Sequence, residues 1–316
     1  MKTNNKDFYL IVMFIFYCCI LYIPGCAYTP KSADISAGQT KAEASQSKSK
    51  KTPQHLWEYK RDFSKLTTIN YDVQTGAQMF NEQKEYFLKQ NYAVNSPLQE
   101  NTLNRLQTIV YRLAAVSDNP NLPYEVAIVE NDEMVNAYCL PGGKIVVFTG
   151  LFQSGMVNIN NDNEIAAALA HEIAHANMRH IARQTKAASN RGFAGKMLSA
   201  FFGKDTLEDA LVSSVYLITS SLFIPGYERK HEKEADQVGL YYMTKAGYDP
   251  QANIDIWVRA AQKNNPGNTK KQNKTAFWAS HPADGARANF LRGFYADALE
   301  VQKGMQVQVT NPTQSH

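Results

Sequence analysis

The chain has 316 residues, of which 44% are hydrophobic and 11% aromatic, enough to build one substantial core. Its formal net charge of +4 is small for this length, and no basic stripe is interleaved with aromatic residues, which argues against a nucleic-acid partner. The sequence contains no internal repeats, so a helical-repeat appendage is not expected.

Residues 1–25 have the pattern of a secretion signal. Two lysines precede an apolar run over residues 8–23, which is short for a membrane-spanning helix. Ile23-Pro24-Gly25-Cys26 then resembles a lipobox, the cleavage and lipidation signal of bacterial lipoproteins. This resemblance implies that Cys26 becomes the lipidated first residue of an envelope protein, and Ala27 after it indicates the outer membrane, facing the periplasm. An uncleaved N-terminal anchor is the alternative.

The segments next to the signal and at the C-terminus lack the composition of a core. Residues 26–55 are rich in Ser, Lys, Ala, Gln and Thr and are expected to form a disordered tether. Residues 301–316 are expected to be a flexible tail, which leaves residues 56–300 as the folded domain. Once the signal is removed and Cys26 is lipidated, Cys139 remains unpaired, so no internal disulfide is expected and Cys139 should be buried.

Hydrophobic patterning predicts a mainly helical α+β fold. Six helices are expected, over residues 71–91, 98–116, 161–183, 229–246, 250–263 and 282–299. A strand over residues 124–129 and a hairpin within residues 136–150 supply a small sheet beside the third of these helices. Residues 187–226 are the least readable part, and we expect them to pack over that helix, with gating of a cleft as a further possibility.

His171-Glu172-Ile173-Ala174-His175 is the most informative motif. Residues four apart lie on one face of a helix, so both imidazoles can reach one ion, and neutral imidazole suits Zn²⁺. Glu172 projects about 100° away from His171 and can reach a water held by that ion. The spacing predicts metal-assisted hydrolysis of a peptide bond. The alternative is an ordinary histidine pair on a surface helix, which the apolar run over residues 165–170 disfavours.

A third metal ligand is available downstream. The sequence reads Arg229-Lys-His-Glu232-Lys-Glu234-Ala235-Asp236, and together with the HExxH motif it resembles the zinc metallopeptidases of the HtpX, BepA and LoiP type, which are related to mitochondrial OMA-type and CAAX prenyl-protein proteases. The resemblance implies a gluzincin-type domain with one Zn²⁺ per chain, held by His171, His175 and Glu232 rather than Glu234. It also implies that Asp236 orients a ligand histidine and that Arg229 supports the site. A solvated, charged helix face is the alternative.

Two further segments extend this resemblance. One is similar to the family's NAxxxPGG signature beside a strand that could pair with extended substrate, and it makes substrate-binding candidates of Asn136, Pro141, Gly142 and Gly143. The other, Ser280-His281-Pro282 followed by Arg287, resembles the family's HPxxxxR element. It implies that Arg287 supports the site and that His281 lies near the metal, either as an extra ligand or as a donor to the oxyanion.

The expected mechanism follows from these roles. Glu172 would take a proton from the metal-bound water and deliver it to the leaving amine. The metal, helped by His281, would stabilise the charge that develops on the carbonyl oxygen. No GxSxG sequence supports a serine nucleophile. The resemblance implies polypeptide substrates and quality control of misfolded or misassembled envelope proteins. The alternative function is a lipoprotein that binds or chaperones outer-membrane proteins with little proteolysis.

Overall fold

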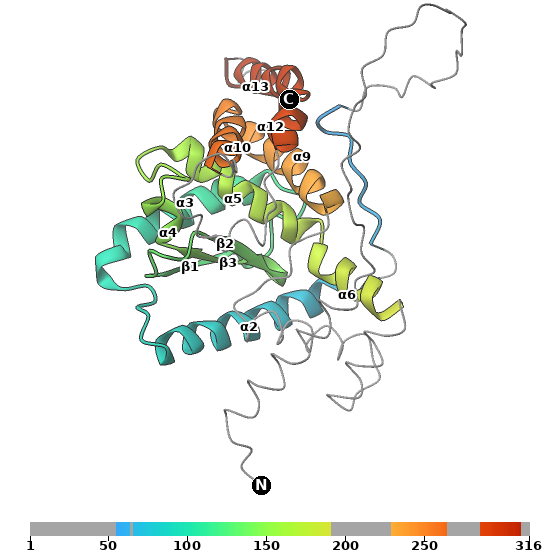
Figure 1. The fold of residues 1–316 in the computed structure, drawn as a ribbon. Coiled ribbons are helices and arrows are strands. Elements are labelled where there is room, and N and C mark those ends of the chain that lie inside the picture. The colour runs from blue at the N-terminus through green and yellow to red at the C-terminus, as the bar shows by residue number, and fades with distance from the viewer. Residues whose placement is uncertain (1–54, 64–65, 191–228, 264–284, 311–316) are drawn as a thin grey trace, which may run out of the picture. The chain divides into compact units, whose positions relative to one another are not determined.

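The computed structural model describes residues 55–63, 66–190, 229–263 and 285–310 (Figure 1). The signal with Cys26, the tether up to residue 54, most of the segment 187–226, and His281 lie outside the described residues. What the sequence predicts for them stays a prediction. None of the described helices combines the length and the apolar character that a membrane crossing requires.

A three-stranded mixed sheet forms the centre of the described fold. β1 (Glu125–Val129) runs parallel to β3 (Lys144–Phe148), and β3 pairs antiparallel with β2 (Ala137–Leu140), which gives the order β1-β3-β2. β2 and β3 are the hairpin predicted within residues 136–150, joined by the short 3-10 turn η2 (Pro141–Gly143). Among the described strands only β3 pairs with β2, so β2 is an edge strand of this sheet.

Helices cover both faces of this sheet. α2 (Ile69–Lys89) lies along one face, and α3 (Glu100–Ala115) and α5 (Asp162–Asn177) lie on the other (Figure 1). Because successive strand residues point to opposite faces, Ala127 packs in the same cluster as the apolar side chains of α2, whereas Ile128 packs with those of α3 and α5. The sheet is therefore apolar on both sides, and its strands are almost wholly buried.

The first two predicted helices are confirmed. The Thr68 hydroxyl caps α2 by accepting a hydrogen bond from the backbone N–H of Tyr71. α3 follows the 3-10 turn η1 (Pro97–Gln99). Its buried stripe has the i, i+3, i+4, i+7 spacing of an amphipathic helix and consists of Leu106, Ile109, Val110 and Leu113.

The helix that carries the histidine pair is shorter than predicted. α5 begins after Asn161, whose side chain accepts from the N–H of Asn163, but it ends at Asn177 instead of continuing to residue 183. Arg179 adopts a left-handed conformation with φ of 53°, and α6 (His180–Asn190) starts directly after it. The Arg179 guanidinium donates to Asp72 Oδ2 at 2.7 Å and to the Thr67 carbonyl at 2.6 Å, so contacts with the start of α2 hold the break.

Two of the C-terminal helices, α9 (Arg229–Lys245) and α10 (Gln251–Lys263), pack on α5. α12 (Gly285–Arg292) packs on α9 and α10, and α13 (Tyr295–Thr310) packs on α9. The short α4 (Gly150–Gln153) follows β3. The predicted helix over residues 282–299 is thus divided in the described part of the chain, and its second half continues past residue 300. The Gly293 N–H closes the end of α12 by donating to the Phe290 carbonyl at 3.1 Å.

α9 approaches α5 closely because of one glycine. A Cβ atom at Gly239 would lie 3.0 Å from the backbone nitrogen of His171 and 3.1 Å from the carbonyl of Ala170, closer than side-chain carbons normally pack. This contact places α9 alongside α5 (Figure 1). The small residue therefore sets the distance between the two helices that carry the predicted metal ligands.

Candidate metal centre

The three predicted metal ligands converge in the structure. His171 and His175 project from α5, Glu232 projects from α9, and one ligand atom from each lies within 4.8 Å of the others. The two histidine Nε2 atoms are 3.0 Å apart, and the Glu232 carboxylate oxygens lie 3.5 Å and 3.4 Å from them. Donors bound tetrahedrally at about 2.0–2.1 Å would be separated by roughly 3.3 Å, so this donor set fits a zinc ion.

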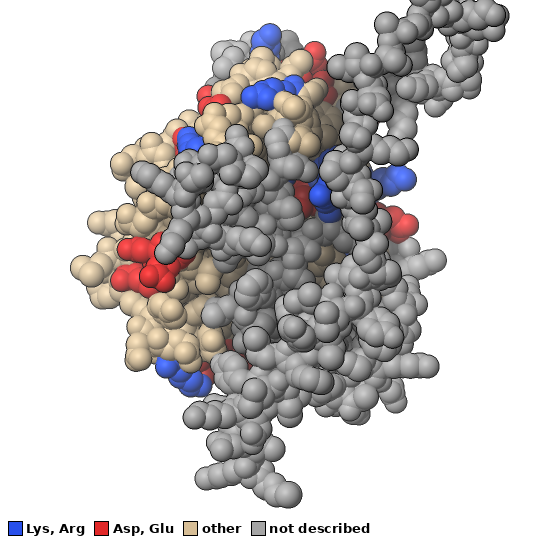
Figure 2. Space-filling view, in the orientation of Figure 1, with Lys and Arg blue, Asp and Glu red and all other residues tan. Residues whose placement is uncertain are grey.

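The charges of this centre are buried. On the face drawn in Figure 2 the described Lys, Arg, Asp and Glu side chains form small groups of both signs. Glu232, Asp236 and Arg287, in contrast, are at most 3% exposed. Buried charges are tolerated only when they are paired, so each of these side chains needs the others or a metal ion.

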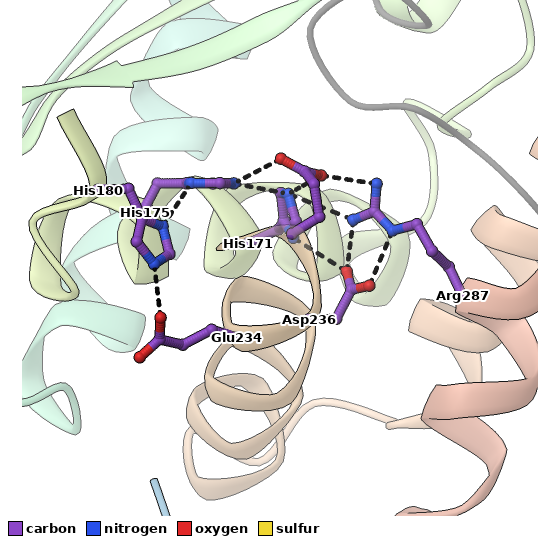
Figure 3. A network of polar contacts seen from close by, with 7 residues as sticks. His171, His175, His180, Glu234, Asp236 and Arg287 are labelled. Carbon is purple, nitrogen blue, oxygen red and sulfur yellow. Dashed lines mark hydrogen bonds and ion pairs between the residues drawn. The ribbon is translucent and has the colours of Figure 1, made fainter. Parts of the chain in front are cut away.

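Asp236 and Arg287 lie beside the ligand histidine His171 (Figure 3). Asp236 Oδ1 lies 3.1 Å from His171 Nδ1, which leaves the Nε2 atom of that ring facing the centre. Arg287 donates twice to Asp236, at 2.8 Å and 2.6 Å, and its Nη1 lies 2.7 Å from Glu232 Oε2. The same guanidinium stacks on Trp257 with its central carbon 3.3 Å from the ring centroid. The structure thus places Asp236 and Arg287 beside the ligands, as the resemblance implies.

The polar contacts shift the proton affinity of the ligand histidine. Burial opposes a charge on His171, but the carboxylates of Asp236 and Glu232 outweigh burial and raise the pKa of His171 to about 9. Arg287, together with the same His171 ring, lowers the pKa of Asp236 against the effect of burial. Without a metal the centre therefore favours a cation between its carboxylates, which is the environment that a divalent ion requires.

Glu172 lies beside the ligands without joining them. It is 2% exposed, and together with His171 and Asn253 it borders a small cavity whose remaining lining is apolar. The apolar lining includes Leu151, Met156, Val157, Ala168, Ile256 and Trp257. A carboxylate beside the ligand cluster is placed to move a proton. The adjacent apolar cavity can accommodate an apolar side chain of a bound molecule.

Cys139 is buried, as predicted, in the strand next to Glu172. Burial, reinforced by the charge of Glu172, holds the pKa of the Cys139 thiol well above its usual range. The thiol is therefore protonated at neutral pH and is a packing residue of β2.

The candidate substrate-binding residues are buried in the hairpin. Asn136 is 4% exposed, and its carbonyl accepts from the N–H of Phe148. Gly142 has φ of 72°, and a Cβ atom there would come within 2.6 Å of the Cα of Val73 on α2. Pro141, Gly142 and Gly143 are likewise buried, so these residues shape the turn and seat it on α2. Contact between them and a substrate stays a prediction.

The remaining candidates are less constrained by the structure. Arg229 is the first residue of α9 and its side chain is exposed, so a supporting role for it stays a prediction. The roles of His281 and Cys26 also stay predictions, because both lie outside the described residues.

Three residues that border the centre were not predicted as part of it from the sequence. His180 Nδ1 lies 2.8 Å from His175 Nδ1, and His180 Nε2 lies 3.0 Å from Glu234 Oε2 (Figure 3). Arg183 Nη1 lies 2.6 Å from the same oxygen. On one continuous helix, His180 would project about 140° away from His175. The break in the helix at Arg179 instead places the His180 ring against the His175 ring. From the sequence, Glu234 was considered only as an alternative to Glu232 for the third metal ligand.

Two helix histidines and a glutamate from a second helix, with a second carboxylate beside them, define a metallopeptidase-type centre on a mainly helical α+β fold. The chain belongs to peptidase family M48, whose model matches residues 100–294. This confirms the resemblance to the BepA and OMA type, and membership implies a catalytic metal.

The curated relatives point to the same family. The chain is 40% identical over 147 residues to mitochondrial metalloendopeptidase OMA1 of Arabidopsis thaliana, covering 46% of this chain and 27% of that protein. It is 28% identical over 206 residues to the Saccharomyces cerevisiae OMA1, covering 64% and 56%. It is also 28% identical over 165 residues to the beta-barrel assembly-enhancing protease of Escherichia coli, covering 50% and 32%. The matches therefore span between about a quarter and about half of these relatives.

Proposed function

We propose that the protein is a zinc-dependent endopeptidase that hydrolyses peptide bonds with a metal-activated water. The observation that carries this proposal is the convergence of His171, His175 and Glu232 within 4.8 Å, with Glu172 beside them as a carboxylate outside the ligand set. When bound, a zinc ion lowers the pKa of its water and polarises the scissile carbonyl.

The protein's own residues divide the remaining work. Glu172 accepts the proton of the attacking water and returns it to the leaving amine. Asp236 holds the His171 ring so that Nε2 faces the ion, and Arg287 fixes Glu232 and Asp236 together. His281 is the candidate donor to the developing oxyanion.

The substrates we propose are extended polypeptides with apolar side chains, such as misfolded or misassembled envelope proteins. β2 is an edge strand that packs on α5, so a segment of extended backbone can add to it without strong sequence preference. The apolar cavity beside His171 and Glu172 favours an apolar side chain near the scissile bond. The proposed localisation to the cell envelope rests on the lipobox-like residues 23–26.

The variant Glu172→Gln tests this function. It should retain zinc but lose cleavage of a denatured casein reporter by about a hundred-fold to ten-thousand-fold, which is the usual contribution of a general base. Asp162→Asn, an exposed carboxylate on the first turn of the same helix, is the matched control and should cleave at the wild-type rate. Wild-type cleavage by Glu172→Gln would contradict the proposed mechanism.

The second candidate function is a chaperone-like lipoprotein for outer-membrane proteins. The name of one set of relatives joins beta-barrel assembly with proteolysis, which favours keeping this alternative. The same variant separates the two: if Glu172→Gln loses cleavage but restores growth of a strain lacking the protein, the chaperone function is the important one.

A further inference from the structure

The two ligand histidines are supported by different groups on their outer nitrogens. His171 Nδ1 faces a carboxylate, Asp236 Oδ1, at 3.1 Å. His175 Nδ1 faces another imidazole nitrogen, His180 Nδ1, at 2.8 Å. Behind His180, the oxygen Oε2 of Glu234 lies 3.0 Å from Nε2 and also receives Arg183. His175 is therefore linked to a carboxylate through an intervening ring (Figure 3).

The directions of the hydrogen bonds allow one arrangement of protons along the series His175, His180 and Glu234. If His175 binds the ion through Nε2, its proton is on Nδ1 and is donated. His180 Nδ1 must then accept, so the His180 proton is on Nε2 and is donated to Glu234. Arg183 donates to the same carboxylate at 2.6 Å. Every member has a partner of the right kind when His175 is a neutral metal ligand.

The backbone is shaped to make this contact. His180 is completely buried and is the first residue of α6, directly after the left-handed Arg179. His180 also stacks on His231 of α9, with ring centroids 4.5 Å apart, and this contact limits rotation of the ring. A left-handed arginine is unfavourable unless surrounding contacts hold it, and the bonds to Asp72 and Thr67 do so.

We propose that His180 and Glu234 form a relay that fixes the tautomer and orientation of His175 and thereby strengthens zinc binding. Both are positioning residues, because they act through His175 and do not reach the ion. The alternative is a purely structural role, in which the contact between His180 and Glu234 only stabilises the packing of α6 on α9. The proposal rests on zinc binding at the proposed centre, and it does not depend on peptide hydrolysis.

Substitutions at His180 separate these accounts in the full-length protein. His180→Phe keeps a ring of similar size but removes both nitrogens, whereas His180→Asn retains an amide oxygen that can accept from His175 Nδ1. We expect His180→Phe to weaken zinc binding by about ten-fold to a hundred-fold, and His180→Asn to recover part of that loss. His55→Phe, at a half-exposed histidine outside the centre, is the matched control.

The zinc dissociation constant is measured by competition with a chromogenic chelator, and circular dichroism and melting of the metal-free protein monitor folding. A folded His180→Phe variant with wild-type zinc affinity would overturn the relay, as would equal weakening in the Phe and Asn variants. If His180→Phe does not fold, Glu234→Gln decides: weaker zinc binding at an unchanged melting temperature supports the relay, and unchanged binding overturns it. Failure of the wild-type protein to bind zinc would instead refute the proposed function.

Discussion

Three carboxylates in the first turns of α9 make different contacts around the centre. Glu232 faces both ligand nitrogens, Glu234 faces His180, and Asp236 faces His171. Although burial opposes it, the contacts with His180 and Arg183 lower the pKa of Glu234. One short segment therefore provides a metal ligand and the outer support of both ligand histidines.

Arg287 should matter most when the metal is absent. It is the cation between Glu232 and Asp236, and removing one partner from a buried set of charges costs roughly 3–5 kcal/mol. Zinc brings positive charge to the same carboxylates, so Arg287→Met should destabilise the metal-free protein more than the zinc-loaded protein. Calorimetry with and without zinc measures this, and the zinc-induced rise in melting temperature should be larger in the variant.

Arg105→Met is a suitable control, because Arg105 pairs with the exposed Asp162 on the surface. In Arg105→Met, the zinc-induced rise in melting temperature should equal that of the wild type. If Arg287→Met also shows the wild-type shift, the charge compensation assigned to Arg287 is wrong.

At the residue scale, spacing alone predicted part of the site. The i, i+4 positions of His171 and His175 follow from helix geometry, and in the structure a ligand atom of each lies within 4.8 Å of the other. Spacing could not separate Glu232 from Glu234, since both follow Arg229 within two turns of a charged helix; the family resemblance selected Glu232. His180 could not be predicted, because its place depends on the break at Arg179, which contacts between distant residues hold.

At the element scale, the approach of α9 to α5 depends on Gly239. A methyl group there would press on the backbone at His171 and Ala170, which cannot move aside as a flexible side chain can. Gly239→Ala should therefore push Glu232 away from the histidines and lower both zinc affinity and stability, the latter by roughly 1–3 kcal/mol. Chelator competition and thermal melting measure these two effects.

Gly304→Ala is the matched control on α13, where an added Cβ atom would meet nothing within 4 Å. It should leave zinc binding unchanged and raise helix stability by about 0.5–1 kcal/mol. Equal behaviour of the two variants would show that Gly239 does not set the helix spacing.

A second element-scale contact joins α10 to α5. The Arg259 guanidinium bonds both oxygens of Glu164, at 2.7 Å and 2.9 Å, and this contact lowers the pKa of Glu164 below its ordinary value of 4.5 although burial opposes it. A lowered carboxyl pKa adds stability above the unfolded-state value, and that stability is lost as the pH falls through the folded-state value.

Glu164→Gln should therefore reduce stability at pH 7 by roughly 1–3 kcal/mol and make the loss of stability below about pH 5 less steep. Urea unfolding between pH 3 and pH 7 tests both effects. Glu85→Gln, from an exposed pair with Lys89, should change stability by less than about 1 kcal/mol. If the free energy of unfolding of Glu164→Gln falls with decreasing pH as steeply as that of the wild type, the contribution assigned to the Glu164 carboxylate is wrong.

Element existence was predictable, and element ends were less so. Periodicity and turn residues predicted α2, α3, β1 and the β2–β3 hairpin, which the structure confirms. The parallel pairing of β1 with β3 was not predicted, because strand order depends on contacts between distant segments. The end of α5 was predicted too late for the same reason, since Asp72, which holds Arg179, is 107 residues away in the sequence.

At the scale of the whole molecule, we propose a catalytic domain tethered by lipid to the cell envelope. Cys26→Ala should prevent lipidation and leave the protein unprocessed or released from the membrane fraction, since acyl chains supply membrane affinity of about 0.8 kcal/mol per buried CH₂. Fractionation of cells labelled with radioactive palmitate measures this. Unlabelled wild-type protein that still sediments with membranes would favour the uncleaved anchor.

The zinc content of the purified protein tests the central claim most directly. We expect about one zinc per chain in the wild type and in Glu172→Gln, and a sharp fall in Glu232→Ala. Glu234→Ala should still bind zinc, more weakly than the wild type. Full zinc occupancy in Glu232→Ala, or no zinc in the wild type, would contradict a centre built from α5 and α9.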